Sequence, residues 1–215
     1  MNGNLSNTIP TLSILIPSYN DENYIKECLD SILSNVSQDF EVILNDDCSD
    51  DNTLKIARSY NDSRLSCNLA DRKLGTVENW KTCCDLAKGR YIYILGSDDY
   101  ISPGGIDGII PKLTGNCILT APMRCFIDAD NTTRDIQSSP EMISKIFLDL
   151  SKANGRNLLF FSNHDELVHN FFPREMMRRV YELAPDSGNT VFFYWVLLLF
   201  HGSKITCTED IFLNK

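Results

Sequence analysis

The sequence has little positive charge and few histidines. Its 215 residues include 20 lysines and arginines against 29 aspartates and glutamates, for a formal net charge of −9, and only 3 histidines. A nucleic-acid-binding surface requires a basic stripe, and this sequence contains none. The same acidity disfavours electrostatic docking on anionic lipids. We therefore expect no nucleic-acid partner.

Targeting signals and long hydrophobic runs are also missing. The first ten residues, MNGNLSNTIP, lack the basic and apolar regions of a signal peptide. The most apolar stretch, VFFYWVLLLF at 191–200, is far shorter than the roughly 20 residues that a membrane-spanning helix needs. We interpret it as a buried helix, and a peripheral membrane contact is the alternative.

The 8 cysteines form no C-x-x-C pair, and no histidine stands at metal-ligand spacing from two of them. Most occupy apolar positions of periodic segments, where cysteine acts as a small hydrophobic residue in a reducing compartment. This pattern indicates a cytoplasmic protein. A P-loop motif is absent, and no G-x-G-x-x-G follows the first apolar run, which disfavours a P-loop or dinucleotide-binding fold.

The first half alternates between two kinds of segment. Apolar runs typical of buried strands occupy 11–17, 40–44, 64–69 and 91–95. Helical periodicity follows these runs at 20–33, 54–60, 76–89 and 103–113. Asn20 and Ser102 are expected as N-caps, and Gly89 is expected to close the third helix. Such alternation predicts right-handed crossovers and a parallel sheet.

The second half is less regular. Its apolar runs predict strands at 117–122, 124–128 and 204–213, and its periodic segments predict helices at 139–152, 173–184 and 191–202. A D-x-D triplet, Asp128 to Asp130, is interpreted as a hairpin turn rather than a metal site, because aspartate and asparagine favour such turns. Residues 1–215 are expected to form one domain.

Polar clusters follow three of the predicted strands. Pro17 to Asn20 follow the first, Asp46 and Asp47 the second, and Asp98 and Asp99 the fourth. Ligands of open α/β sheets bind at this edge, outside the carboxyl ends of the strands. Oxygen ligands suit Mn²⁺ or Mg²⁺, and Mg²⁺ is usually held by one or two carboxylates plus substrate phosphates. The sequence therefore predicts a divalent cation and a phosphorylated substrate here.

Three stretches in order, SILIPSYNDENYIKECLDSIL, FEVILNDDCSDDNT and LGTVENWKTCCDLAKGRYIYILGSDDYISPGGID, resemble the family 2 nucleotide-sugar glycosyltransferases over about residues 12–113. The resemblance implies an α/β protein of the GT-A fold, a Rossmann-like mixed sheet with a parallel N-terminal half flanked by helices. It also implies a nucleotide-sugar-binding half at 10–113 and an acceptor half at 114–215.

Site residues follow from the same resemblance. The residues expected to bind the nucleotide sugar are Pro17, Ser18, Tyr19, Asn20, Asp46, Asp47, Arg72, Gly75, Asn79 and Asp99. Asp98 matches the metal-binding acid of the D-x-D-type motif, and Lys73 is an alternative to Arg72 near the diphosphate. Two positions depart from the family pattern: Gly96 replaces the first acid of that motif, and Cys48 replaces a glycine.

The implied activity is a hexosyltransferase-type reaction. It would move a sugar from a nucleotide-diphosphate donor, with UDP expected, to a hydroxyl of a saccharide or lipid-linked saccharide, with inversion. This chemistry fits surface polysaccharide biosynthesis at the inner face of the plasma membrane. The general base stays open among Asp165, Glu166 and Asp186. Alternatives are a nucleotide-sugar-binding domain without catalysis and, less favoured, a nucleotidyltransferase.

Overall fold

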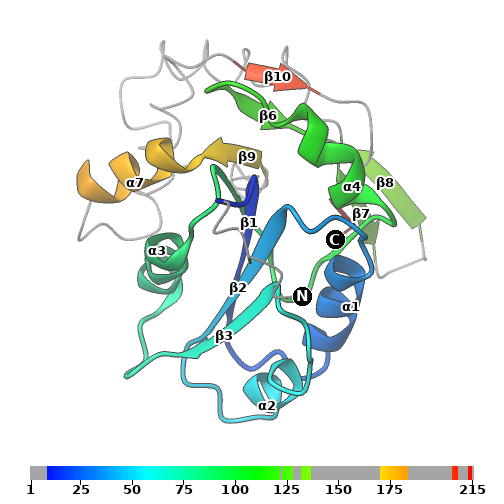
Figure 1. Ribbon diagram of the computed structural model, residues 1–215. Coiled ribbons are helices and arrows are strands. Elements are labelled where there is room, and N and C mark those ends of the chain that lie inside the picture. The colour runs from blue at the N-terminus through cyan, green and yellow to red at the C-terminus, as the bar shows by residue number, and fades with distance from the viewer. Residues whose placement is uncertain are drawn as a thin grey trace, which may run out of the picture.

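The structure is a computed structural model that describes residues 9–121, 123–127, 132–136, 170–183, 205–207 and 213–214 (Figure 1). Its main sheet contains β1 (Leu12–Ser18), β2 (Phe40–Asp46), β3 (Leu65–Leu69), β4 (Tyr91–Ile94), β6 (Ile118–Thr120), β9 (Asn170–Pro173) and β10 (Ile205–Cys207). The strands lie in the order β10-β6-β9-β4-β1-β2-β3.

Strand direction divides this sheet into two parts. β1 pairs in parallel with both β2 and β4, and β3 extends the parallel part beyond β2. β9 runs antiparallel between β4 and β6, and β10 pairs in parallel with β6. The prediction of a mixed sheet with a parallel N-terminal half is confirmed.

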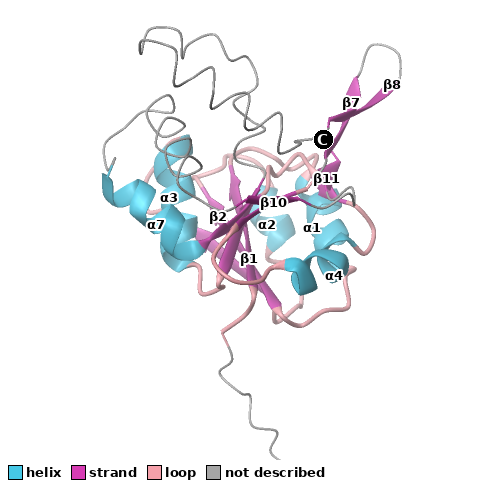
Figure 2. Ribbon diagram, turned by 90° about the horizontal axis from the view of Figure 1, so that it is seen from above, coloured by secondary structure: helices cyan, strands magenta, loops and turns pink. Residues whose placement is uncertain are grey.

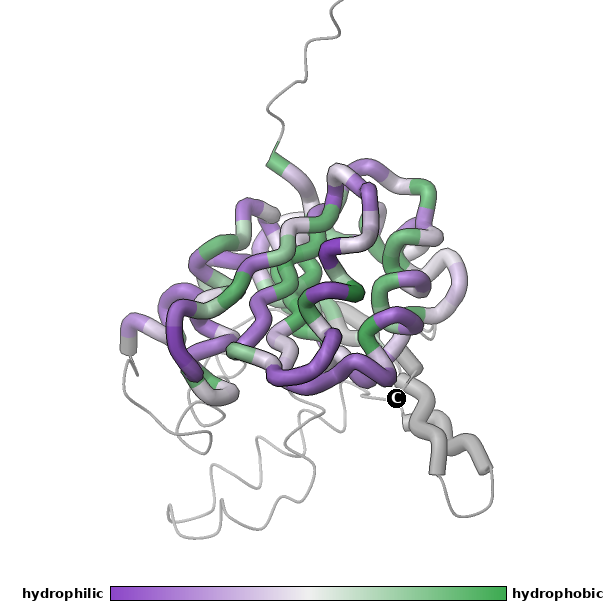
Figure 3. Tube along the Cα trace, turned by 90° about the horizontal axis from the view of Figure 1, so that it is seen from below, coloured by the Kyte–Doolittle hydropathy of each residue, from purple (hydrophilic) through white to green (hydrophobic). Residues whose placement is uncertain are grey.

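Helices cover both faces of the sheet (Figure 2). They are α1 (Ile25–Leu33), α2 (Thr53–Ala57), α3 (Thr76–Leu86), α4 (Gly105–Ile109), a 3₁₀ turn (Ile110–Lys112) and α7 (Arg174–Leu183). Buried residues of α1, α2 and α4 form one core cluster with the sheet, and those of α3 and α7 form a second. Hydrophobic strands occupy the middle of the molecule, and hydrophilic segments surround them (Figure 3).

A smaller sheet contains β5 (Tyr100–Ile101), β7 (Met123–Ile127), β8 (Thr132–Ile136) and β11 (Leu213–Asn214). β7 and β8 form an antiparallel pair that projects from the body of the molecule (Figure 2). The D-x-D triplet lies between these two strands, outside the described residues. The antiparallel pairing agrees with the hairpin predicted for this part of the chain.

Several predicted helix ends were wrong. α1 begins at Ile25, because Asn20 adopts a left-handed backbone (φ 57°) and its side chain accepts a hydrogen bond from Asp50 N. α4 begins at Gly105, after a left-handed Gly104 (φ 69°) that the prediction placed inside the helix.

Other elements differ in extent. α3 ends at Leu86, before the predicted closure at Gly89. The strand predicted at 204–213 is two short strands in different sheets, and β9 was not predicted. The second-half helix predicted at 173–184 is α7, whereas the helices predicted at 139–152 and 191–202 lie outside the described residues.

Arg64 joins the end of α1 to the segment before β3. Its guanidinium is largely buried and donates to three carbonyl oxygens, those of Leu33, Asn35 and Ser37. It also forms a bidentate pair with Asp62. Since an uncompensated buried charge is costly, these acceptors fix the position of α1 against the sheet.

A glycine substitution tests the close contact between β1 and the segment before β4. A Cβ on Gly89 would lie 2.6 Å from Ser13 N and 2.8 Å from Leu12 C, both backbone atoms that cannot rotate away. Gly89→Ala is expected to lower the free energy of unfolding by about 2 kcal/mol or more, measured by urea denaturation.

Gly108→Ala is the matched control, because a Cβ there meets nothing within 4 Å. It should raise stability by up to about 1 kcal/mol through reduced freedom of the unfolded chain. Equal stability of the two variants would show that β1 does not approach Gly89 as described.

Acid sensitivity is a second test. The hydrogen bonds from Arg64 lower the pKa of Asp62. A carboxyl whose pKa is lower in the folded state stabilises the protein above its unfolded pKa of about 3.9 and loses that effect as the pH falls below it. Asp62→Asn should therefore cost about 1 kcal/mol at pH 6, and the difference from wild type should shrink towards pH 2.5.

The exposed Asp71 provides the control for general charge effects, as Asp71→Asn. If the difference in free energy of unfolding between wild type and Asp62→Asn stayed constant across this pH range, the pairing of Asp62 with Arg64 would be contradicted.

Candidate active site

The carboxyl ends of β1, β2 and β4 meet at one edge of the sheet. The parallel register places Ser18 opposite Asp46, and Asp47 N donates to Ser18 O at 2.9 Å. Leu95 N donates to Leu15 O at 2.9 Å, which carries the chain alongside β1 as far as Gly96. The structure therefore places both acidic pairs, after β2 and after β4, at the same edge.

The loop after β1 is joined to the loop after β2. Asn20 N donates to Ser49 Oγ at 2.9 Å, and Asp50 N donates to Asn20 Oδ1 at 2.8 Å. These reciprocal bonds hold Asn20 in its left-handed conformation, which asparagine tolerates better than most residues. Next to it, Tyr19 is 38% exposed, so part of its surface is open to solvent.

Each acid of the first pair organises a loop. Asp46 is buried and accepts hydrogen bonds from Ser49 N and Ser49 Oγ at 2.9 and 2.6 Å. Asp47 is also buried and accepts from the backbone N–H groups of Leu74 and Gly75. Asp47 thus brings the loop before α3 to the carboxyl-end edge of the sheet.

Cys48 occupies the turn where the family pattern has glycine. It adopts a left-handed backbone with φ 57°, a conformation that glycine adopts without strain. Its thiol donates to Ala70 O at 3.3 Å. The turn therefore keeps the backbone shape that a glycine would allow.

Asn79 and Gly75 lie beneath this edge at the start of α3. Gly75 has φ 80° and precedes the first helical residue. Asn79 is buried, accepts from Asn45 Nδ2 at 2.9 Å and donates to Ser18 O at 3.5 Å. The predicted residues Ser18, Gly75 and Asn79 are therefore neighbours.

The two basic residues of the loop before α3 point to different partners. Arg72 forms an exposed ion pair with Glu78 at 2.6 Å. Lys73 places its ammonium 3.5 Å from the centroid of the Tyr19 ring. Hydrogen bonding to Tyr19, together with the carboxylates of Asp47 and Asp50, raises the pKa of Lys73. Lys73 thus places a positive charge beside the loop after β1.

The second acidic pair lies on a tight turn after β4. Asp99 N donates to Gly96 O at 3.1 Å; Asp98 is exposed and Asp99 is buried. A Cβ on Gly96 would lie 2.8 Å from Asp98 Oδ1 and 2.9 Å from Asp99 Oδ2. Both carboxylates therefore turn back towards Gly96, into space that a side chain at this position would occupy.

The thiol of Cys28, on α1, lies beside this turn, and its pKa is affected by the negative charge there. Its thiol donates to Gly96 O at 3.7 Å. Burial raises the pKa of Cys28, and the carboxylates of Asp99, Asp98 and Asp21 raise it further. The thiol stays neutral, and carboxylates gathered in this way favour a bound cation.

The donor set fits a hard divalent cation. Within the described ranges, no group of three or more metal-binding side chains is present. One or two carboxylates are nevertheless the usual protein contribution to Mg²⁺ when substrate phosphates supply other ligands. Asp98, exposed beside Asp99, meets that requirement.

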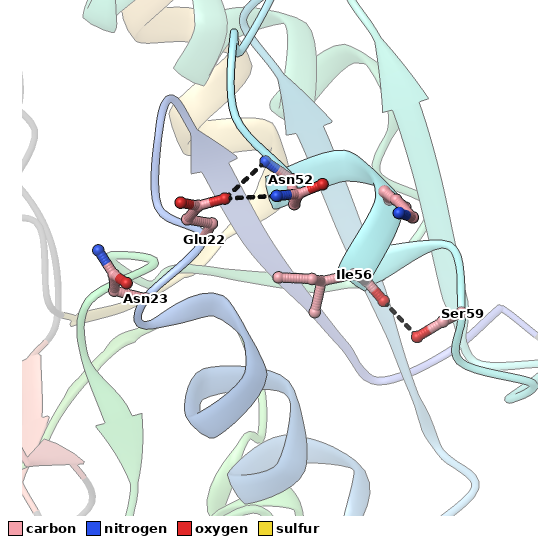
Figure 4. Close-up of a pocket in the computed structure, with 6 residues that line it drawn as sticks. Glu22, Asn23, Asn52, Ile56 and Ser59 are labelled. Carbon is pink, nitrogen blue, oxygen red and sulfur yellow. Dashed lines mark hydrogen bonds between the residues drawn. The ribbon is translucent and has the colours of Figure 1, made fainter.

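Two open pockets of about 530 Å³ lie beside α2. Glu22, Asn23, Asn52, Lys55, Ile56 and Ser59 line one of them (Figure 4). There Glu22 accepts hydrogen bonds from Asn52 N and Asn52 Nδ2 at 2.9 and 2.8 Å. The other is lined in part by Asp46, with Lys55 and Arg58 of α2 at its wall.

The three candidate bases are not among the residues that the structure describes. Asp165, Glu166 and Asp186 are outside the described residues. Within the described helices, none has the length and apolar character needed to cross a bilayer.

Comparison with known proteins agrees with the resemblance. Residues 13–181 match the family described as Glycosyl transferase family 2, so the chain belongs to that family. It is 35% identical over 102 residues to the hyaluronan synthase of Pasteurella multocida, covering 47% of this chain and 10% of that protein. It is 31% identical over 133 residues to the Escherichia coli glucosyltransferase WfaP, covering 62% of this chain and 53% of that one.

Solved structures show the same fold. S. aureus TarS residues 1–349 superpose with a TM-score of 0.72 at 18% identity, covering 95% of this chain and 60% of that one. The Pyrobaculum calidifontis mannosyltransferase PcManGT, in complex with GDP-Man and Mn²⁺, gives 0.63 at 15% identity, covering 97% and 57%. The GT-A fold is confirmed, and the chain spans about half or less of the relatives' length in both sequence matches.

The role of Asp47 as an organiser of the loop before α3 is testable. Asp47→Asn keeps one acceptor oxygen but turns an amide N–H₂ towards the second backbone donor. The amides of Leu74 and Gly75 should exchange with deuterium at least about tenfold faster, since a bond to a charged acceptor is worth about 1.5–3 kcal/mol. Hydrogen–deuterium exchange of this segment measures the effect.

Asp50→Asn is the control. Asp50 contacts Asn20 through its backbone N–H, which the substitution does not remove. If the amides of residues 74 and 75 exchanged at an unchanged rate in Asp47→Asn, the claim that Asp47 organises the loop before α3 would be contradicted.

Proposed function

We propose that this chain binds a nucleotide-diphosphate sugar, with UDP as the expected nucleotide, and transfers the sugar to a hydroxyl acceptor with the help of a divalent cation. The observation that carries this proposal is the meeting of two acidic pairs at one edge of a GT-A sheet. Asp46 ends β2 and Asp47 follows it there, and Asp98 and Asp99 follow β4. Residues 10–113 form the nucleotide-sugar-binding half, and residues 114–215 the acceptor half.

The base of the nucleotide is assigned to the loops after β1 and β2. The half-exposed Tyr19 offers a ring face, and the buried carboxylates of Asp46 and Asp47 offer hydrogen-bond acceptors to base N–H groups. Pro17, Ser18 and Asn20 shape the same loop. Both bonds between Asn20 and the Ser49–Asp50 turn hold this surface in place before a ligand arrives.

The diphosphate is assigned to the space between Lys73 and Asp98. Lys73 carries a positive charge beside Tyr19, and Gly75 and Asn79 lie below it at the start of α3. Asp98, with Asp99 beside it, would hold Mn²⁺ or Mg²⁺. When bound there, the cation stabilises negative charge on the departing diphosphate.

The acceptor side is inferred from the family. Inversion requires a general base that takes the proton from the attacking hydroxyl, and Asp165, Glu166 and Asp186 remain its candidates. A lipid-linked saccharide is the proposed acceptor class, because WfaP, to which this chain is similar, is named for a diphosphoundecaprenol-linked sugar. Surface polysaccharide biosynthesis at the cytoplasmic face of the membrane, with peripheral contact, is the corresponding setting.

A second candidate function is nucleotide-sugar binding without transfer. It is favoured by one observation: Gly96 stands where the family's motif has its first acid. Turnover separates the two functions. Release of UDP from UDP-sugars with Mn²⁺ and a saccharide acceptor supports transfer, whereas binding of every donor without release of nucleotide from any supports the second candidate.

Ligand-dependent stability tests the site itself. UDP with Mn²⁺ should raise the unfolding temperature of wild type, because a ligand at a hundred times its Kd adds about 2.7 kcal/mol to the folded state. Asp98→Asn should lose the metal-dependent part of this shift, and the exposed Asp85→Asn on α3 should keep it. A full metal-dependent shift in Asp98→Asn would contradict the assignment of the cation.

A further inference from the structure

Asp21 belongs to the loop after β1, and its side chain reaches the turn after β4. One of its carboxylate oxygens, Oδ2, accepts hydrogen bonds from Tyr19 N and from Ser97 Oγ. Ser97 is 6% exposed and directly precedes the acidic pair Asp98–Asp99. A single oxygen atom of Asp21 thus contacts both ends of the proposed site. One end is Tyr19, whose ring is proposed to contact the nucleotide base. The other end is the turn that carries Asp98, the proposed metal ligand.

The backbone of Asp21 fixes the carboxylate itself. Asp21 N donates to Thr53 Oγ1 at 2.7 Å, at the start of α2. Asp21 O accepts from Tyr24 N and Ile25 N at 3.0 and 2.9 Å, which begins α1. Because the backbone N–H and C=O of Asp21 are both hydrogen-bonded, the position of its Cα is fixed. The side chain therefore extends from a fixed position.

Another hydrogen bond reaches this turn from α1. Cys28 of α1 donates to Gly96 O at 3.7 Å, a long and weak thiol bond. The hydrogen bond between Asp21 and Ser97 has a charged acceptor and a partly buried setting, so it is the stronger link. Displacing the carboxylate would therefore remove a strong link between the turn and the loop.

We propose that Asp21 is a positioning residue that sets the distance between the nucleotide-base site at Tyr19 and the metal turn at Ser97–Asp99. The inference rests on the proposed function. The covalent structure of a nucleoside diphosphate limits the distance between its base and its phosphates, so groups at both ends bind together only when their spacing lies within that reach. Asp21 couples the two ends without touching the ligand.

The measured quantity is the metal enhancement, defined as the Kd of UDP without Mn²⁺ divided by the Kd with Mn²⁺. Isothermal titration calorimetry of the full chain, well below the unfolding temperature, gives both constants. Asp21→Ala and Ser97→Ala should each lower the metal enhancement by about tenfold, as expected for one lost bond to a charged acceptor. The double variant should fall no further than Asp21→Ala alone, because both changes remove the same link.

Asp21→Asn separates position from charge. Its amide oxygen can accept the bonds from Tyr19 N and Ser97 Oγ, so metal enhancement should stay within about threefold of wild type. A tenfold loss in Asp21→Asn would overturn the proposal, since it would mean that the negative charge of residue 21 attracts the cation directly.

The remaining outcomes are also decisive. If wild type does not bind UDP in the presence of Mn²⁺, the proposed function fails. If wild type binds with metal enhancement and both alanine variants keep it, the positioning role fails and the proposed function stands. Additive losses in the double variant would likewise overturn the shared link. Unfolding temperatures that fall while metal enhancement is unchanged would assign Asp21 to stability alone.

Discussion

The parallel pairing of β1 with β2 and β4 is the constraint on which the site depends. Parallel strands bring their carboxyl ends to one edge, so the residues after each strand become neighbours although they are far apart in the chain. Carboxylates gathered there repel one another. Asp46 and Asp47 are stabilised by hydrogen bonds from Ser49 and from the loop before α3, whereas Asp98 is exposed.

Loop-to-loop hydrogen bonds then turn this edge into a single surface. Asn20 holds the loops after β1 and β2 together, Asp47 holds the loop before α3, and Asp21 reaches the turn after β4. Lys73 adds positive charge beside Tyr19. The proposed site therefore has hydrogen-bond acceptors, an aromatic side chain and an exposed carboxylate in place at one edge of the sheet, as preorganised binding requires.

Sequence patterns predicted β1, β2, β3 and β4, because apolar runs such as 91–95 are stable only when they are buried. They also predicted which acids would meet, because parallel topology follows from strand–helix alternation. Patterns failed where a contact distant in sequence decides the local structure: Asn20 bonds to Asp50 and so does not cap α1. Gly89 lies against Ser13 and so does not close α3. The role of Asp21 likewise depends on Ser97, 76 residues away.

A crystal structure grown with UDP and Mn²⁺, with anomalous diffraction recorded at the manganese edge, tests the central claim most directly. The account predicts an anomalous peak bound by the Asp98 carboxylate at about 2.0–2.2 Å, a typical distance for a small divalent cation, with the diphosphate between it and Lys73. A manganese peak away from this sheet edge, or a nucleotide bound with its base remote from Tyr19 and Asp47, would contradict it.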